Sequence, residues 1–350
     1  MTTSRIRILI GVLVLVVAAV LPLLNISVPG VFPGPTYTPG TLQLLALAML
    51  MSGLALSYHL MFGVTGMLSF GHALYYAIGA YGLGIVLERT PFGLLPAIAL
   101  VVAGGLVVAT VLGALSLRVT GISFAMVTLA FAQAGSVLIR RNSGITGGDE
   151  GLSLATEHVP DFFIGVFNTR NLYWLSLAVL VVVFAVVLWF EKSRAGHVAV
   201  AIRENEMRVR VLGMQPFTIR LGAFVVASVL ASVVGIVYIV LQSGVTTRAA
   251  STDLTLTILV IVVLGGVGSR WGAVIGGVVY TILDQRLTAL AASDWIDQLP
   301  AVLRIPLSEP LFILGTLFIL VVIFLPGGIA GAAREVRTAR KEPVLEEELR

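Results

Sequence analysis

The sequence predicts an all-α fold: a polytopic transmembrane helical bundle of about ten helices, with both termini cytoplasmic. Three observations support this prediction: 58% of the 350 residues are hydrophobic, only 11% are charged, and the mean hydropathy is +1.03. Soluble domains carry roughly 25% charged residues, so this apolar excess requires lipid as the solvent. Because a membrane span takes about 20 apolar residues, the composition accommodates about eight to ten spans and no sizeable soluble domain.

Ten apolar runs follow one another along the chain. The first, at 6–24, comes after Arg5 and Arg7 and lacks a small-residue cleavage pattern, which indicates an anchor helix rather than a signal peptide. The others cover residues 41–62, 72–88, 92–117, 119–140, 172–190, 219–243, 254–269, 271–290 and 309–325. The third and eighth runs are short and rich in glycine, which leaves open whether either helix is broken or re-entrant.

The positions of the basic residues predict the orientation of the bundle. With the N-terminus inside, the inner segments hold 15 of the 22 Lys and Arg residues, and the outer segments hold 7. This bias agrees with the positive-inside rule, and an even number of spans then places both termini in the cytoplasm. We expect residues 1–333 to form one transmembrane domain and residues 334–350 to form a cytoplasmic tail.

Several classes of function are excluded by what the chain lacks. It has no cysteine, which excludes disulfides, thiolate metal sites and cysteine nucleophiles. It has no Gly-Lys-Ser/Thr sequence either, so it does not bind ATP through a Walker-type loop. Since the basic residues are explained by membrane orientation, we expect no nucleic-acid partner, and we expect no cofactor, no metal ion and no enzymatic activity.

The predicted span interiors carry no Asp, Glu, Lys or Arg, whereas ion-coupled carriers commonly place such groups at membrane depth. The polar side chains within the spans are His59, His72, Gln43, Gln133, Gln242 and several Ser and Thr. A lone His in a helix bundle is more often a hydrogen-bonded structural residue than a proton relay, so a proton-coupled carrier is disfavoured. A sodium-coupled carrier, a channel and a non-transporting scaffold remain as alternatives to a transporter driven by a partner protein.

A glycine-rich segment precedes the third helix. Residues 63–72, GVTGMLSFGH, place glycines at irregular spacing beside hydroxyl and imidazole side chains. This pattern predicts non-helical backbone, which membranes tolerate where it is buried in protein or lines a cavity. Plain helix packing is an equally open interpretation. If the segment lines a translocation path instead, the residues that would contact a polar solute are Gly66, Ser69, Gly71 and His72.

The longest inner loop, residues 191–220, contains an amphipathic stretch. Its apolar residues fall on one helical stripe of Val198, Ile202, Val209 and Leu212. Opposite charges recur at a spacing of four, Glu204 with Arg208 and Glu206 with Arg210, each pair stabilising a helix by about 0.2–0.5 kcal/mol. We expect one helix that ends at Gly213 and lies across the membrane face. It either anchors the loop or docks a cytoplasmic protein, and its balanced charge favours a protein over anionic lipid.

Four stretches of the sequence are similar to segments of a known family. They are GVTGMLSFGHA at 63–73, ITGGDEGLS at 145–153, AIRENEMRVRVLGM at 201–214 and VVLGGVGSRWGAVIG at 262–276. Over about residues 45–330, in the same order and spacing, they resemble the LivM-type permease subunits of branched-chain amino-acid ABC transporters. The ending FLPGGI at 324–329 also fits, and Met67 stands where the family usually has Gln.

The resemblance implies a permease domain that moves branched-chain amino acids across the bacterial inner membrane by alternating access. It implies a second homologous permease subunit, two cytoplasmic ATPase subunits and a periplasmic solute-binding protein as partners within the lipid bilayer. Some family members serve urea, short amides or other amino acids, and these solutes remain open for this chain. The residues implied for ATPase coupling are Ala201, Ile202, Arg203, Glu204, Asn205, Glu206, Leu212 and Gly213, and those of the outer loop are Thr146, Gly147, Gly148 and Gly151.

Overall fold

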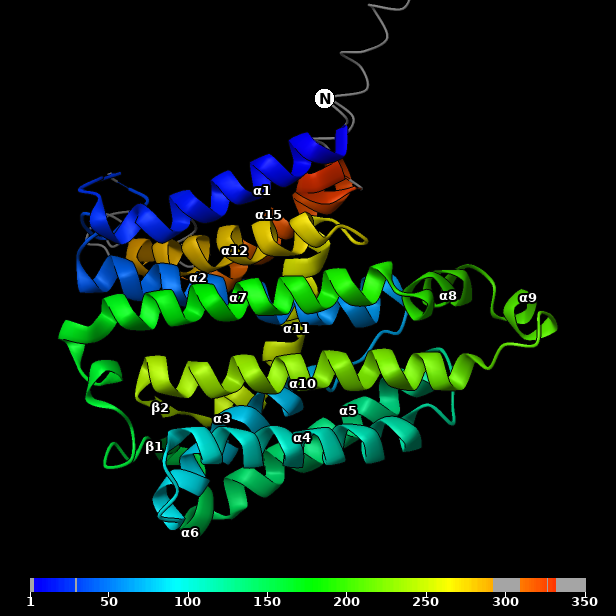
Figure 1. The fold of residues 1–350 in the computed structure, drawn as a ribbon, viewed down its shortest axis with the longest axis horizontal. Helices are drawn as coiled ribbons and strands as arrows, with labels where there is room; N and C mark the ends of the chain where they lie inside the picture. Colours follow the sequence, from blue (N-terminus) through cyan, green and yellow to red (C-terminus); the bar gives the residue numbers. More distant parts are fainter. Residues whose placement is uncertain (1–2, 29, 292–308, 326, 332–350) are drawn as a thin grey trace, which may run out of the picture.

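The computed structural model describes residues 3–28, 30–291, 309–325 and 327–331, and nearly all of its regular structure is helical (Figure 1). Each of the ten predicted runs contains one helix, which confirms the predicted helical membrane bundle. These helices are α1 (Thr3–Val20), α2 (Pro39–His59), α3 (His72–Arg89), α4 (Leu94–Ser116), α5 (Ile122–Arg141), α7 (Thr169–Lys192), α10 (Pro216–Gln242), α11 (Thr252–Gly265), α12 (Arg270–Ala291) and α15 (Pro310–Phe324). The predicted tail, residues 334–350, lies outside the described residues.

Six of these helices are long and apolar enough to cross a membrane: α2, α4, α5, α7, α10 and α12. In Figure 1, α4, α7 and α10 run in nearly the same direction across the molecule. The core of the bundle forms around α2 and α10, of whose spans 89% and 72% are buried inside the protein. Close packing of this kind replaces the hydrophobic drive that is weak between helices in lipid.

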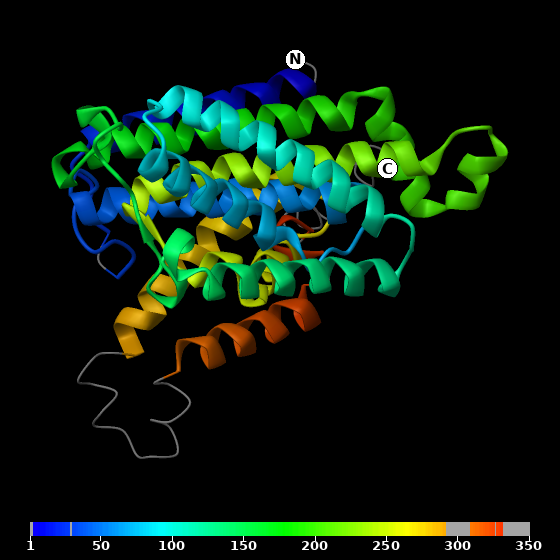
Figure 2. The same ribbon diagram turned by 90° about the horizontal axis from the view of Figure 1, so that it is seen from below.

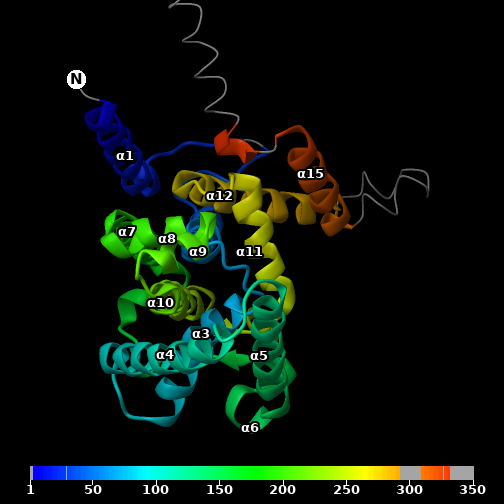
Figure 3. The same cartoon turned by 90° about the vertical axis from the view of Figure 1, so that its right-hand side faces the viewer.

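Helix α11 departs from the direction of the long helices. Figures 1 and 3 both show it crossing their direction rather than running alongside them. Its 14 residues extend about 21 Å, which is shorter than the hydrocarbon core of about 30 Å. The eighth predicted helix therefore does not cross the membrane by itself. Its N-terminus is capped by Ser251, whose Oγ accepts from the backbone N of Leu254 at 3.3 Å. Its Thr255 Oγ1 in turn accepts from the backbone N of Ala73, at the start of α3, at 3.1 Å.

The loops gather at two opposite ends of the bundle. One end carries α8 (Arg194–Glu204) and α9 (Glu206–Val211), which project beyond the long helices in Figures 1 and 2. The other end carries α6 (Ser143–Thr146) and the antiparallel strands β1 (Leu152–Ser153) and β2 (Gly244–Val245). Following the orientation predicted from charge, we refer to these as the inner end and the outer end.

At the inner end, an ion cluster centred on Glu191 joins three helices. Glu191 Oε1 lies 3.1 Å from Nε2 of His59, and Glu191 Oε2 lies 2.8 Å from a guanidinium nitrogen of Arg270. His59 is fully buried at the end of α2, whereas Glu191 and Arg270 are partly exposed at the ends of α7 and α12. A cluster of this kind holds the three helix ends at a fixed spacing where the chain leaves the lipid.

We predict that Glu191→Gln destabilises the purified protein by about 1–3 kcal/mol, because it removes the carboxylate charge that pairs with Arg270 and contacts the buried His59 ring. Thermal unfolding in detergent micelles measures the effect. Lys192→Gln is the matched control, since the neighbouring Lys192 side chain is exposed. Equal melting temperatures for the two variants would show that the cluster contributes nothing to stability.

Candidate functional site

Residues 65–71 form a non-helical segment between α2 and α3. The chain leaves α2 through a π-helical turn, Leu60–Val64, and Thr65 and Ser69 are then buried. Tyr58 Oη donates to the carbonyl oxygen of Ser69 at 3.0 Å, so a side chain of α2 satisfies part of this backbone. The predicted non-helical backbone is therefore confirmed, and it is partly buried in protein and partly lines a cavity, the two settings in which membranes tolerate such backbone.

His72 is the first residue of α3 and is completely buried. Its Nε2 lies 2.8 Å from Oγ of Ser57, whose hydroxyl donates to the carbonyl oxygen of Leu54 at 2.7 Å. This hydrogen bond joins the start of α3 to α2, and the other ring nitrogen, Nδ1, is buried without a partner in the described part of the chain. The ring also packs edge-on against Tyr58, with centroids 5.2 Å apart. This environment is that of a structural histidine.

The segment forms one wall of a cavity of about 330 Å³ at the inner end. Gly66, Met67, Leu68 and Phe70 line it, opposite Arg220 and residues between 117 and 126 at the junction of α4 and α5. Of the four residues predicted for a translocation path, Gly66 lies on this cavity. Ser69, Gly71 and His72 lie buried behind the wall and hold its shape.

The predicted coupling stretch is two helices, not one. Asn205 adopts an extended conformation (φ −157°, ψ 99°) that ends α8, and its Oδ1 accepts from Arg208 N at 3.0 Å, which caps α9. Ile202 and Val209 are buried as the apolar stripe predicts, whereas Leu212 is 73% exposed. The single-helix prediction was wrong because an Asn cap competes with helix continuation.

The charges of this region separate into two groups. Glu206 pairs with Arg210, as the spacing predicts, and also with Arg220 of α10 at 2.8 Å. Glu204 and Arg208 do not pair with each other, because the break at Asn205 separates the helices that carry them. Glu206 therefore holds α9 to the bundle, and Glu204, like Ala201, is exposed to solvent.

Arg203 connects α8 to the cavity wall. Its guanidinium donates to the carbonyl oxygen of Gly63 in the π-helical turn. Gly66 has a left-handed backbone (φ +72°), and a Cβ there would lie 2.9 Å from Cγ of Arg203. The glycine thus allows the arginine stem to pass against the segment. Helix α8 is therefore in direct contact, through Arg203, with the chain that forms the cavity wall, and a movement of α8 would act on that wall.

The glycine-rich outer loop folds into a compact turn. Thr146 is buried, and its Oγ1 donates to the carbonyl oxygens of Ile139 and Asn142. Gly147 has a φ of +74°, and a Cβ there would overlap the carbonyl oxygen of Gly151. Gly148 and Gly151 also have positive φ, and the strand pair β1–β2 follows directly. The four predicted residues therefore shape the outer end rather than present polar side chains.

Two features of the structure had no counterpart in the sequence-based site. The Glu191 cluster joins residues from three helices that are distant in the sequence. A single Glu at the end of a predicted helix does not indicate which residues it will pair with. The second is a polar pocket at the outer end that includes Gln43 and Gln242. The presence of these two glutamines in apolar helices is a sequence signal for such a pocket, but it does not indicate that the two side chains lie together.

Comparison with known proteins identifies a matching family, described as branched-chain amino acid transport system / permease component, over residues 40–325. The chain is 28% identical over 268 residues to the high-affinity branched-chain amino acid transport system permease protein LivM of Escherichia coli K12, which covers 69% of this chain. The chain spans 62% of the length of that relative.

Two further relatives extend this comparison. The probable branched-chain amino acid transport permease protein LivM of Methanocaldococcus jannaschii is 25% identical over 351 residues, 87% of this chain and 99% of the relative. The permease protein LivH of E. coli K12 is 23% identical over 298 residues, 79% of this chain and 90% of the relative. No solved structure matches the chain significantly.

We predict that Gly71→Leu and Gly66→Leu each reduce solute transport at least tenfold without preventing membrane insertion. A Cβ at Gly71 would lie 2.7 Å from the backbone oxygen of Thr128, and one at Gly66 would press on Arg203, so either change displaces the cavity wall. Uptake by cells that express equal amounts of each variant measures the effect. Gly93→Leu is the control, since nothing lies within 4 Å of a Cβ at Gly93. Normal uptake by both variants would refute a functional role for this wall.

Proposed function

The chain belongs to the family of permease components of branched-chain amino acid transport systems, and we propose that it is the transmembrane subunit of an ABC importer for branched-chain amino acids. It is a multi-pass protein, and we place it in the bacterial inner membrane with α8 and α9 in the cytoplasm. In this proposal it has no ATPase activity of its own, and separate ATPase subunits drive alternating access. Residues 1–333 form the permease domain and residues 334–350 a cytoplasmic tail.

The contact of Arg203 with Gly63 carries this proposal. It connects a helix that projects from the inner end to the π-helical turn Leu60–Val64, which leads directly into the non-helical segment that lines a cavity. A carrier driven by its own ion gradient needs no projecting helix, whereas a transporter without a nucleotide site must receive motion from a partner. We assign α8 and α9 the role of receiving that motion and residues 63–71 the role of responding to it.

The tip of α9 has the composition of a protein contact. Met207, Val211 and Leu212 are 67%, 81% and 73% exposed, and Glu204 and Arg208 lie near them on the chain. Apolar side chains surrounded by charges of both signs suit a groove in a protein better than a lipid surface. In this proposal the partner is one of two cytoplasmic ATPase subunits.

We infer the remaining partners from the similarity to two kinds of permease. This chain is similar to both LivM and LivH, which are named as permeases of branched-chain amino acid transport. We propose that it pairs with a second, homologous permease subunit and receives its solute at the outer end from a periplasmic solute-binding protein.

Reconstitution tests the whole proposal. The chain, its second permease and the ATPases are placed in vesicles, the binding protein is added on the side of the outer end, and uptake of labelled leucine is measured. We expect uptake that requires ATP and every subunit. Undiminished leucine uptake by this chain alone would identify a self-sufficient carrier or channel, and uptake of urea or amides in place of leucine would correct the solute.

We predict that Leu212→Asp separates the permease from its ATPase, because it places a charge in an apolar contact at the α9 tip. Co-purification of the ATPase with the permease should fall at least tenfold, while the helical content stays unchanged. Phe167→Asp is the matched control, since Phe167 is fully exposed at the outer end. ATPase recovery equal to that of the control would overturn the docking assignment.

A further inference from the structure

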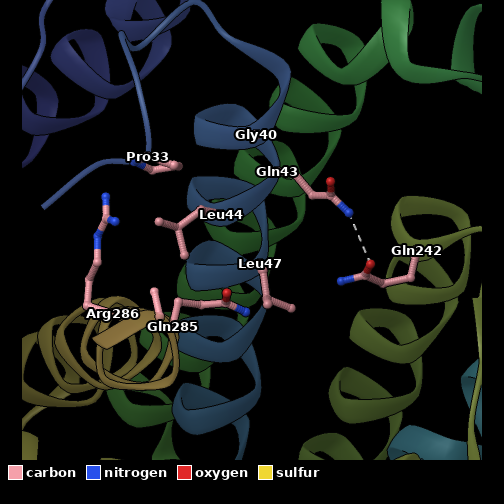
Figure 4. Close-up of a pocket in the computed structure, with 9 residues that line it drawn as sticks. Pro33, Gly40, Gln43, Leu44, Leu47, Gln242, Gln285 and Arg286 are labelled. Carbon is pink, nitrogen blue, oxygen red and sulfur yellow. Dashed lines mark hydrogen bonds between the residues drawn. The ribbon is translucent and has the colours of Figure 1, made fainter. Parts of the chain in front are cut away.

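A second cavity, of about 350 Å³, opens at the outer end between α2, α10 and α12 (Figure 4). Its polar lining consists of Gln43, Gln242, Gln285 and Arg286, and its apolar lining includes Leu44, Leu47 and Ala289. A pocket of this size that combines a few polar side chains with an apolar wall has the character of a small-molecule site. It lies at the end of the bundle opposite to α8 and α9.

The charge of the pocket is unbalanced. Arg286 is the cation of its lining, and none of the residues that line it is acidic. Its Nε donates to the carbonyl oxygen of Val31 at 2.7 Å, which fixes the guanidinium at the rim. Its Nη2 is buried and has no hydrogen-bond partner in the described part of the chain. A buried guanidinium nitrogen without a partner is costly, and a carboxylate is the group whose geometry matches it best.

The glutamines supply the opposite polarity. Gln43 Nε2 donates to Gln242 Oε1 at 3.1 Å, which links α2 to α10 and leaves Gln43 Oε1 able to accept. Figure 4 shows Gln285 next to Arg286 on α12, with its amide turned toward Leu47. The pocket therefore offers a cationic donor, amide oxygen acceptors and an apolar surface within one cavity.

We propose that this pocket is a reception site for a free α-amino acid at the outer end. The carboxylate binds the guanidinium of Arg286, the ammonium group binds a glutamine amide oxygen, and an aliphatic side chain lies against Leu44 and Leu47. The proposal rests on the proposed transport function and deepens it, because a solute that carries a carboxylate uses Arg286. Neutral urea and simple amides would leave the guanidinium without a counter-ion.

Leucine uptake by the complete transporter in vesicles tests the role of Arg286. We expect Arg286→Gln to reduce leucine uptake at least tenfold at low leucine concentration, because a charge-assisted bond is lost. Arg170→Gln is the matched control, since Arg170 is exposed at the outer end and is not part of the lining. Failure of the wild type to take up leucine would overturn the proposed function. Normal wild-type uptake with equal rates in both variants would overturn the reception site alone.

Since Arg286 also fixes the loop through Val31, a second measurement avoids changing it. The chain has no native cysteine, so Ala289→Cys places one thiol in the pocket and Thr246→Cys places one on the exposed surface of the outer end. In the assembled transporter, we expect a membrane-impermeant maleimide to modify both, and leucine-loaded binding protein to protect Ala289→Cys selectively, at least threefold. Equal modification with and without leucine would overturn the proposal, as would protection by vesicle lipid alone.

Discussion

The structure depends on one constraint: every backbone polar group at membrane depth must find its partner inside the protein. Long apolar helices satisfy this constraint by themselves, and six of the described helices are of that kind. The segment at 65–71 and the short α11 do not, and both pack against other helices on one side. Tyr58 from α2 and Thr255 from α11 donate or accept where helical hydrogen bonding is interrupted. Irregular backbone is thus confined to places where side chains can complete it.

The same constraint explains where the charges lie. Charged side chains are expensive in the hydrocarbon region, so the chain places them at the helix ends. There they join elements that hydrophobic packing alone would leave free to slide, as Glu191 does for α2, α7 and α12. Asp284 and Arg286, in the outer third of α12, depart from this pattern, and Arg286 lines a polar cavity.

Local sequence patterns predict much of this fold. Ten apolar runs define ten helices, and irregular glycines define the non-helical segment before α3. The sequence patterns did not predict the break at Asn205, because the apolar period and the charge spacing continue through it. The signal for the break is a helix cap that depends on the Asn205 side chain alone. The outer pocket could not be predicted from local patterns at all. The hydrogen bond between Gln43 and Gln242 joins residues 199 positions apart, and no local pattern indicates which helices become neighbours.

The π-helical turn at Leu60–Val64 explains why the contact of Arg203 with Gly63 can transmit a movement of α8. A helix end leaves carbonyl groups without intrahelical donors, and Gly63 is buried, so water does not replace a missing partner. Arg203 supplies that donor from α8. If α8 moved while the turn stayed in place, the carbonyl would lose its hydrogen bond at a cost of about 1–3 kcal/mol. The turn and the segment after it therefore reach lower free energy by following α8, which is how a displacement at the inner end would reach the wall of the cavity.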